Sequence, residues 1–280
     1  MNPGFRLICS KLLDIIIYNI KVTSGSIDLQ TKILNVLKLV SIDNNEIFQI
    51  LFMFYCNKNN KINLDQYYTP YTIGEFIIKL LQPNKKLIDP ACGTGDLVKN
   101  YIGDITCWDI CPNVLEICKQ NYKLNNKEIN IECLNTLLEY DKGNGSYDYC
   151  VLNPPFGSST VITDKNILNN YELGKNKKQA EIGLLFIERA INLVKDDGIV
   201  FIIVPNGYLG NSTKNIQELK KYILNFRIIG IIELPSNSFS RSGTGVSTSI
   251  LILQKNNNKK VYDIYIKKIY NIGYVLNKKN

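Results

Sequence analysis

The feature that most constrains the fold is a regular alternation of strand-like and helix-like segments that begins near residue 67. Seven short runs have the apolar, β-branched composition of buried strands: Lys86–Asp89, Ile105–Asp109, Ile129–Cys133, Tyr149–Leu152, Ile199–Val204, Arg227–Leu234 and Ser249–Leu253. Four stretches between them repeat apolar residues at helical spacing: Ile73–Leu81, Asn113–Tyr122, Ala180–Val194 and Ile216–Leu224. Such alternation predicts an α/β fold with a doubly wound, mostly parallel sheet.

Two segments depart from this alternation. Residues 1–63 repeat apolar side chains at helical spacing, which predicts a short N-terminal helical extension before a domain of residues 64–280. The apolar start of that extension, Phe5–Ile20, is interrupted by charges and too short to span a bilayer, and no cleavage signal follows it. The stretch Gly157–Lys178 is polar and weakly periodic, which predicts a mobile surface loop.

Composition excludes several kinds of catalytic and metal site. The chain has no histidine, which removes Ser-His-Asp and Cys-His catalysis and every zinc site that needs imidazole. Its eight cysteines include no C-x-x-C pair, so neither a disulfide scaffold nor a paired-knuckle zinc site is expected. We therefore expect a reduced, intracellular protein, cytoplasmic or located wherever its substrate is, that uses no metal and no membrane.

Charge is distributed unevenly along the chain. Residues 1–164 hold 15 Lys/Arg and 17 Asp/Glu, whereas residues 165–280 hold 18 and 8. The second half is therefore the candidate face for a polyanion such as DNA. The alternative is a compositional bias, because only four of the basic residues are arginines and the chain is rich in lysine and asparagine.

A glycine-rich turn follows the first predicted strand of the alternating region. Residues Asp89–Asp96 read Asp-Pro-Ala-Cys-Gly-Thr-Gly-Asp and are expected to lead into a helix, whose first amides would bind polar ligand groups. The turn lacks the Gly-Lys-Ser/Thr of a P-loop and the third glycine of the dinucleotide fingerprint. One strand later, Asp109 stands where an acidic residue can bind the hydroxyls of a ribose. Each feature alone is also typical of an ordinary turn, but together they predict a pocket for an adenosine-containing cofactor.

A second motif, Asn153-Pro154-Pro155-Phe156, follows the strand Tyr149–Leu152. Two prolines fix φ and carry no N–H, which leaves nearby carbonyl groups free to point outward. The Asn153 side-chain oxygen and the Pro154 carbonyl are a rigid pair of acceptors suited to an exocyclic amine. Phe156 offers a face for stacking on a planar base, so the motif predicts chemistry on an amino group without a histidine base.

These motifs belong to a longer ordered series. The segments are Gln66–Pro70, Asp89–Gly95, Trp108–Ile110, Leu134–Leu137, Asn153–Gly157, Asp197–Gly198, Val204–Gly207, Glu233–Phe239 and Gly243–Ile250. In this order they resemble the N6-adenine DNA methyltransferases, and in particular the methylase core of type I restriction–modification modification subunits. The resemblance covers about residues 64–275 and implies the S-adenosylmethionine-dependent methyltransferase type of sheet.

The resemblance also implies roles for individual residues. Those assigned to S-adenosylmethionine are Tyr68, Thr69, Pro70, Asp89, Ala91, Cys92, Gly93, Thr94, Gly95, Asp109, Ile110, Asn135, Thr136 and Asn153. Those assigned to methyl transfer onto a flipped adenine are Asn153, Pro154, Pro155 and Phe156. Asn135 stands where the family usually has an aspartate that contacts the cofactor adenine, and its side-chain oxygen can still accept a hydrogen bond.

Three readings of the function stay open. The first is methylation of adenine N6 in DNA, with sequence recognition supplied by a separate specificity subunit, since the chain shows no apparent target-recognition domain. The second keeps the fold but changes the acceptor to a glutamine side chain or an RNA base, because an Asn-Pro-Pro motif suits amides and exocyclic amines alike. The third is a cofactor-binding module without turnover, which the intact Asn153–Phe156 motif disfavours.

Overall fold

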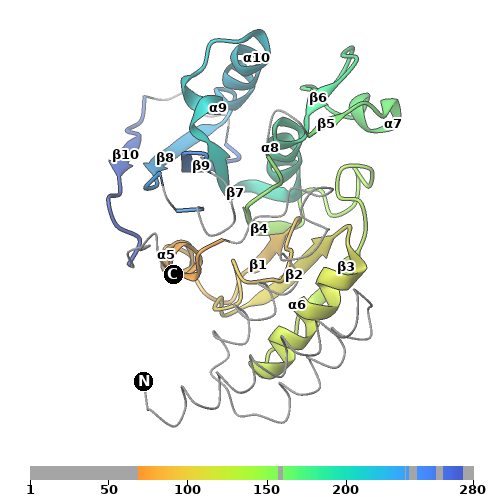
Figure 1. Ribbon diagram of the computed structural model, residues 1–280, viewed down its shortest axis with the longest axis vertical. Helices are drawn as coiled ribbons and strands as arrows, with labels where there is room; N and C mark the ends of the chain where they lie inside the picture. The colour runs from red at the N-terminus through yellow and green to blue at the C-terminus, as the bar shows by residue number, and fades with distance from the viewer. Residues whose placement is uncertain (1–68, 157–159, 237, 240–244, 257–260, 274–280) are drawn as a thin grey trace, which may run out of the picture. The chain divides into compact units, whose positions relative to one another are not determined.

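Eight strands form one mixed sheet in the part of the chain that is described (Figure 1). The computed structural model describes residues 69–156, 160–236, 238–239, 245–256 and 261–273, so the extension expected over residues 1–63 lies outside it. The strands are β1 (Lys86–Asp89), β2 (Asp104–Asp109), β3 (Asn130–Cys133), β4 (Tyr147–Leu152), β7 (Val194–Pro205), β8 (Arg227–Glu233), β9 (Thr248–Gln254) and β10 (Tyr265–Lys268). The helices are α5 (Tyr71–Lys79), α6 (Pro112–Leu124), α7 (Lys165–Leu168), α8 (Ile182–Leu193), α9 (Asn206–Gly210) and α10 (Lys214–Ile223). A separate ribbon pairs β5 (Val161–Ile162) with β6 (Ala180–Glu181).

The strand order in the sheet is β10-β8-β9-β7-β4-β1-β2-β3. β9 runs antiparallel to β7 and β8, and the other neighbouring pairs are parallel. Parallel strands joined through helices on both faces are the doubly wound arrangement. The predicted α/β fold is therefore confirmed, and each of the seven predicted strand runs coincides with a strand of this sheet.

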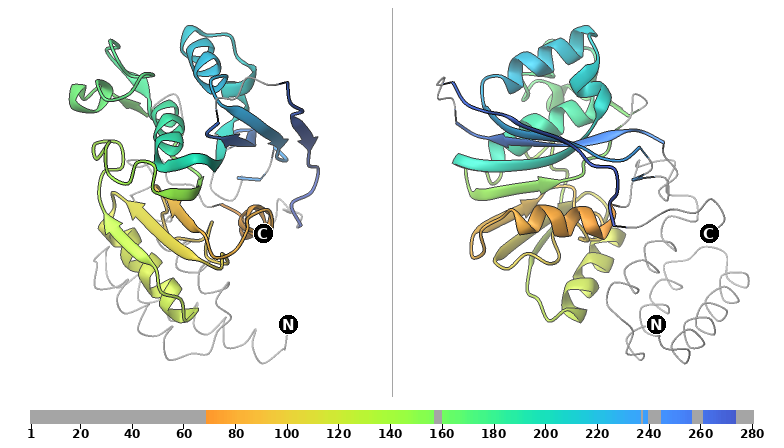
Figure 2. Two further views of the ribbon diagram at one scale, coloured as in Figure 1. Left: turned by 180° about the vertical axis from the view of Figure 1, so that it is seen from behind. Right: turned by 90° about the vertical axis from the view of Figure 1, so that its left-hand side faces the viewer.

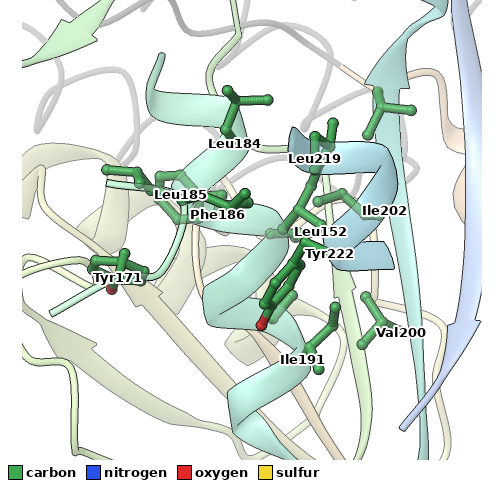
Figure 3. Packing of buried hydrophobic residues seen from close by; sticks show 14 of the residues in the cluster. Leu152, Tyr171, Leu184, Leu185, Phe186, Ile191, Val200, Ile202, Leu219 and Tyr222 are labelled. Atoms are coloured by element: carbon green, nitrogen blue, oxygen red, sulfur yellow. The ribbon is translucent and has the colours of Figure 1, made fainter. Parts of the chain in front are cut away.

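Buried side chains alternate between the two faces of the sheet, as the period of a strand requires. In β1, Ile88 joins the cluster that α8 and α10 cover, and Leu87 joins the cluster that α5 and α6 cover. Figure 2 shows these two pairs of helices on opposite faces. Figure 3 shows the first cluster, which includes both Tyr222 of α10 and Leu152 of β4. A sheet buried on both faces explains why its strands read as continuous apolar runs.

The predicted mobile loop over Gly157–Lys178 is wrong for the residues of it that are described. Residues 160–178 contain β5 and α7, and the side chains of Ile167, Leu168, Tyr171 and Leu173 are buried in the α8 cluster. The buried Glu188 carboxylate of α8 accepts hydrogen bonds from the amides of residues 172 and 173, at 2.8 and 3.0 Å. The segment is polar on average, but its few apolar side chains pack against α8 and its backbone binds one buried carboxylate. These contacts order it.

The predicted helix after the glycine-rich turn is also wrong. Residues 93–100 form turns, and the chain enters β2 at Asp104. Leu97 and Val98 are both buried, together with an ion pair between Asp96 and Lys99 at 2.6 Å. Four consecutive side chains are therefore buried, whereas an amphipathic helix would bury only one face. Successive turns suit this pattern better. In the described part of the chain, no helix is both long and apolar enough to cross a membrane.

Candidate active site

The candidate site lies at the carboxyl ends of three adjacent parallel strands. β1 pairs with β2 on one side and with β4 on the other, so Asp89, Asp109 and Leu152 end at the same edge of the sheet. Chain order reverses at β1, because β2 and β3 continue to one side while β4 and β7 continue to the other. In open α/β sheets, ligands bind outside the carboxyl ends of the strands at such a reversal. The topology therefore brings the two predicted motifs to one place.

The glycine-rich turn depends on two glycines in different ways. Gly93 and Gly95 have φ of +53° and +78°, a region that side chains disfavour. A Cβ at Gly95 would lie 2.5 Å from Cys118 Sγ and 2.7 Å from the Tyr122 ring, so this glycine allows α6 to pack closely. A Cβ at Gly93 would meet no heavy atom within 4 Å in the described residues beyond its chain neighbours. The Gly93 backbone therefore borders open space where a ligand can approach.

Asp109 connects the glycine-rich turn to the end of β2. Its two carboxylate oxygens accept hydrogen bonds from the amides of Gly93 and Cys111, each at 2.9 Å. Burial raises the pKa of this carboxyl group, although both hydrogen bonds act in the opposite direction. A carboxylate has about four acceptor positions, so Asp109 keeps some acceptor capacity for a ribose hydroxyl group.

Asp89 is the most buried acidic residue of the candidate site, with a relative exposure of 1%. Its Oδ1 accepts a hydrogen bond from the Ala91 amide at 3.1 Å. Burial raises the pKa of the carboxyl group well above its ordinary value, and the nearby Cys107 thiol and Asp109 add to this rise. A cationic ligand group at this position would favour the ionised form.

The segment Asn135–Thr136 lies beside the glycine-rich turn, because the Thr136 hydroxyl donates to the Pro90 carbonyl at 2.6 Å. Asn135 differs from its expected arrangement. Its Oδ1 already accepts hydrogen bonds from the amides of Leu137 and Leu138, at 3.1 and 3.3 Å. The oxygen expected to contact the cofactor adenine therefore stabilises the local turn instead.

Arg189 of α8, which the sequence analysis did not single out, anchors the residues that follow Asn135. Its guanidinium group is fully buried and donates to the Thr136 and Glu139 carbonyls, at 3.1 and 3.0 Å. It also donates to the Lys142 carbonyl and to Asn144 Oδ1. One buried cation thus fixes residues 136–144 to α8. The only sequence signal is an arginine inside an otherwise apolar helix, which is typical of a buried polar anchor.

The Asn153–Phe156 motif begins directly after β4. The Asn153 Nδ2 donates to the buried Thr69 hydroxyl at 2.9 Å, which joins two residues that sequence analysis had placed in the site separately. Asn153 Oδ1 is buried and has no hydrogen-bond partner among the described residues. A buried acceptor without a donor costs about 1–3 kcal/mol, so a ligand N–H group that reached this oxygen would recover that cost.

Phe156 differs from its expected arrangement. Its side chain is only 2% exposed and belongs to the cluster under α5, together with Ile73 and Tyr149. In this structure the ring is part of the core, so stacking on a base would require it to turn outward. Tyr68 lies outside the described residues, Pro154 is buried, Pro155 is half-buried and Ile110 is exposed.

Two later motifs also meet at this edge of the sheet. Pro205 at the end of β7 pairs with Thr248 at the start of β9. The Ser249 hydroxyl donates to Asn206 Oδ1 at 2.8 Å, and the Asn206 amide donates to the Ser247 carbonyl at 2.9 Å. Because β7 is parallel to β4, these residues follow the same edge as Asn153.

Three buried thiols lie next to the site, although the sequence predicted no metal-ligand cluster. The Sγ atoms of Cys92, Cys107 and Cys118 all lie within 4.8 Å of one another. Burial raises the pKa of Cys92 well above its ordinary value, whereas hydrogen bonds from Cys107 and Cys92 lower the pKa of Cys118 to about 6. Spacings of 14 and 10 intervening residues carry no recognisable metal-binding pattern, so only the tertiary fold shows this grouping.

The comparisons with known proteins agree with the fold and the motifs. A sequence model of the family described as N-6 DNA Methylase matches residues 45–280. The type I restriction enzyme MpnII methylase subunit of Mycoplasma pneumoniae is 25% identical over 249 residues, which cover 77% of this chain and 44% of that protein. The modification methylase CviBIII of Paramecium bursaria Chlorella virus NC1A is 23% identical over 219 residues, 75% of this chain and 55% of that protein. This chain therefore spans about half the length of these relatives.

Solved structures show the same fold. A Listeria monocytogenes protein described as a class I S-adenosylmethionine-dependent methyltransferase has a TM-score of 0.71 at 20% identity, covering 90% of this chain and 82% of that one. The type I restriction–modification methyltransferase subunit from Streptococcus thermophilus has a TM-score of 0.62 at 19% identity, covering 79% and 50%. At these identities the likeness concerns the fold, whereas the family match confirms the resemblance drawn from the motifs.

Proposed function

The chain belongs to the N-6 DNA Methylase family, and we propose that it transfers a methyl group from S-adenosylmethionine to the N6 amine of adenine in DNA. The observation that carries this proposal is the state of Asn153. Its nitrogen is fixed by Thr69, while its buried oxygen has no partner among the described residues. An amide that is held through its nitrogen and whose oxygen lacks a partner can act as a rigid acceptor for an exocyclic N–H group.

The edge around β1 fits the proposed cofactor, which supplies the methyl group when it is bound. The open space beside Gly93 admits a ligand to the backbone of the turn. Asp89 would hold its ammonium group, and the remaining acceptor capacity of Asp109 would hold a ribose hydroxyl group. Thr136 and the Asn135 nitrogen would border the adenine. Asn135 would therefore act as a donor, since its oxygen is engaged by backbone amides.

The chemistry proposed for Asn153 is hydrogen-bond acceptance from the target amine. The two acceptors, Asn153 Oδ1 and the Pro154 carbonyl, would hold both N–H groups and leave the nitrogen lone pair directed at the methyl group. The nitrogen would become positively charged as its new N–C bond formed and the donor's S–C bond broke, and it would then lose one N–H proton to solvent. The two acceptors would therefore interact more strongly with the transition state than with the substrate. The target base must leave the duplex to reach this edge, which costs a few kcal/mol.

We infer that the chain acts as a subunit. Several relatives are named as methylase subunits of type I restriction enzymes. This supports a separate specificity subunit as the partner that selects the DNA sequence, while the residues described here bind the cofactor and the flipped adenine.

The direct test supplies labelled S-adenosylmethionine with DNA, RNA and protein acceptors in separate reactions, with and without candidate specificity subunits. We expect N6-methyladenine in DNA, identified by mass spectrometry of the digested nucleosides. We expect Asn153→Ala to abolish transfer while cofactor binding, measured by calorimetry, stays close to that of the unmodified protein. N4-methylcytosine, methylglutamine or a methylated RNA base as the product would overturn the proposal.

The matched control is Asn170→Ala, which removes an exposed asparagine amide outside the motif. It should leave transfer and cofactor binding unchanged. Asn153→Ala with full activity would contradict the assigned role even if the product were N6-methyladenine.

A further inference from the structure

The cluster of Cys92, Cys107 and Cys118 joins three separate elements. Cys92 lies in the turn after β1, Cys107 is in β2, and Cys118 is in α6. All three side chains are buried, with exposures of 7, 0 and 0%. Of the three other described cysteines, Cys150 joins the opposite face of the sheet, Cys111 is half-buried and Cys133 is exposed. None of the six described cysteines forms a disulfide.

The geometry of the cluster is close to that of a three-sulfur coordination site. An ion about 2.3 Å from three sulfur atoms in one plane needs sulfur–sulfur separations of about 4 Å. The three Sγ atoms already lie within 4.8 Å of one another, so a contraction of less than about 1 Å would close the site. The absence of a side chain at Gly95 preserves this arrangement, because a Cβ there would lie 2.5 Å from Cys118 Sγ.

The donor set selects the class of ion. Thiolate sulfur is a soft ligand that favours Cu(I), Zn²⁺ and iron–sulfur clusters over hard cations. Structural zinc is almost always four-coordinate, and in the described residues the group contains only these three sulfur ligands. Cu(I) accepts three-coordination, so a buried group of three thiols that no further cysteine or carboxylate of the described residues completes suits Cu(I) better than zinc.

We propose that Cys92, Cys107 and Cys118 form a binding site for one Cu(I) ion. Three Cu–S bonds form and three S–H bonds break, with the protons released to solvent, and neither copper nor sulfur changes oxidation state. The bound ion connects the glycine-rich turn to β2 and α6. Because the folded protein binds the ion and the unfolded chain lacks a preformed site, binding should also raise the thermal unfolding midpoint.

The test titrates the reduced full chain with Cu(I) against a chromophoric Cu(I) chelator, without any methyl donor. It therefore gives its answer whether or not the chain transfers methyl groups. We expect one tightly bound ion per chain, three sulfur neighbours in X-ray absorption, and a higher unfolding midpoint. Zn²⁺ should bind much more weakly in a parallel titration. Four-sulfur coordination, or no ion retained against the chelator, would overturn the proposal.

Variants separate this cluster from the other thiols. Cys118→Ala and Cys107→Ala should each weaken Cu(I) binding by more than about tenfold, since loss of even an outer-shell partner costs that much. The complementary variant carries Cys9→Ala, Cys56→Ala, Cys111→Ala, Cys133→Ala and Cys150→Ala, and it should bind one ion as the unmodified chain does. Loss of binding in a folded form of that variant would contradict the assignment. Circular dichroism checks folding, and X-ray absorption on the unmodified chain decides the coordination if a variant does not fold.

Discussion

At the scale of single residues, the Asp89 carboxyl group is buried in a position that is unfavourable for a negative charge. The Ala91 amide donates to it, but burial still raises its pKa well above the ordinary value. A carboxyl group with a raised folded-state pKa stabilises the fold below its unfolded pKa and loses this contribution as pH rises through the folded pKa. A group placed for a ligand thus lowers the stability of the free protein at neutral pH.

We therefore expect Asp89→Asn to raise the free energy of unfolding at neutral pH while it weakens binding of S-adenosylmethionine. The stability gain should be small near pH 4 and grow as pH rises, because only the unmodified chain must ionise a buried carboxyl group. Denaturant unfolding at several pH values and calorimetry measure the two effects. The matched control, Asp141→Asn at an exposed position, should change neither. A gain in stability that shrinks with pH would contradict this account.

We predict that the Phe156 side chain contributes to the free energy of unfolding, whether or not it also contacts a substrate base. Its ring is buried under α5, and removal of a buried phenylalanine side chain costs about 3–5 kcal/mol. Phe156→Ala should therefore lower the denaturation midpoint in the absence of any ligand. Phe76→Ala removes the same group from a position that is 36% exposed and should cost much less. Equal losses in the two variants would show that Phe156 is not part of the core.

At the scale of elements, α8 holds the segments on either side of it through two adjacent charged residues. Glu188 binds the amides of residues 172 and 173, and Arg189 binds carbonyls between residues 136 and 144. Both side chains are almost fully buried, so their hydrogen bonds form in a medium of low polarity. One helix therefore orders both residues 136–144, which follow Asn135, and the segment that follows the Asn153 motif.

We expect Arg189→Met to loosen residues 136–144 more than the rest of the fold. The Thr136 carbonyl belongs to a buried residue, so leaving it without a donor should cost roughly 1–3 kcal/mol, while methionine retains much of the side-chain volume. Amide hydrogen exchange should accelerate in this segment, and the affinity for S-adenosylmethionine should fall. Arg227→Met, at an exposed position where β8 begins, is the matched control. Exchange that rises uniformly along the chain in Arg189→Met would indicate general destabilisation instead.

The sequence predicts helices and strands well where consecutive side chains are buried. It predicts them poorly where the order of a segment depends on a few individual contacts. β1 is predicted to the residue, because a strand buried on both faces is a visible apolar run. The ordered segment that contains Ile167 and Tyr171 is not predicted. Its few apolar residues are buried only because α8 packs against them and Glu188 binds the neighbouring amides. The four exposed residues of β10 carry no core pattern, so this edge strand was missed as well.

The same distinction applies to the candidate site. The motifs at Asp89, Asp109 and Asn153 are recognisable because each lies within a few consecutive residues at the end of a strand. The engaged oxygen of Asn135 and the three-thiol cluster depend on side-chain positions that no linear pattern encodes. Spacing in sequence therefore finds ligand-facing turns, whereas tertiary packing decides which atoms of those turns remain available.

At the scale of the whole molecule, the excess of basic residues after position 164 is the basis for expecting DNA contact. The Lys177–Glu218 ion pair, at 2.6 Å, connects the segment after the Asn153 motif to α10. Exposed Lys178 and Lys214 lie within four residues of this pair along the chain. Figure 1 shows α10 and the β5–β6 segment on the same side of the eight-stranded sheet's described domain. We expect phosphate contacts on this surface.

DNA affinity should consequently fall steeply as salt rises, with a slope of about −0.9 in log–log form for each phosphate contact. Lys178→Gln combined with Lys214→Gln should weaken binding and make this slope shallower by about 2, because each lysine removed ends one counterion release. Lys119→Gln combined with Lys123→Gln makes the same change in net charge on exposed positions of α6. If DNA binds the surface that carries Lys178 and Lys214, the α6 double variant should leave the salt slope unchanged. Equal effects of the two double variants would show that only the net charge of the protein matters. A slope near zero for the unmodified chain would favour compositional bias as the origin of its lysines.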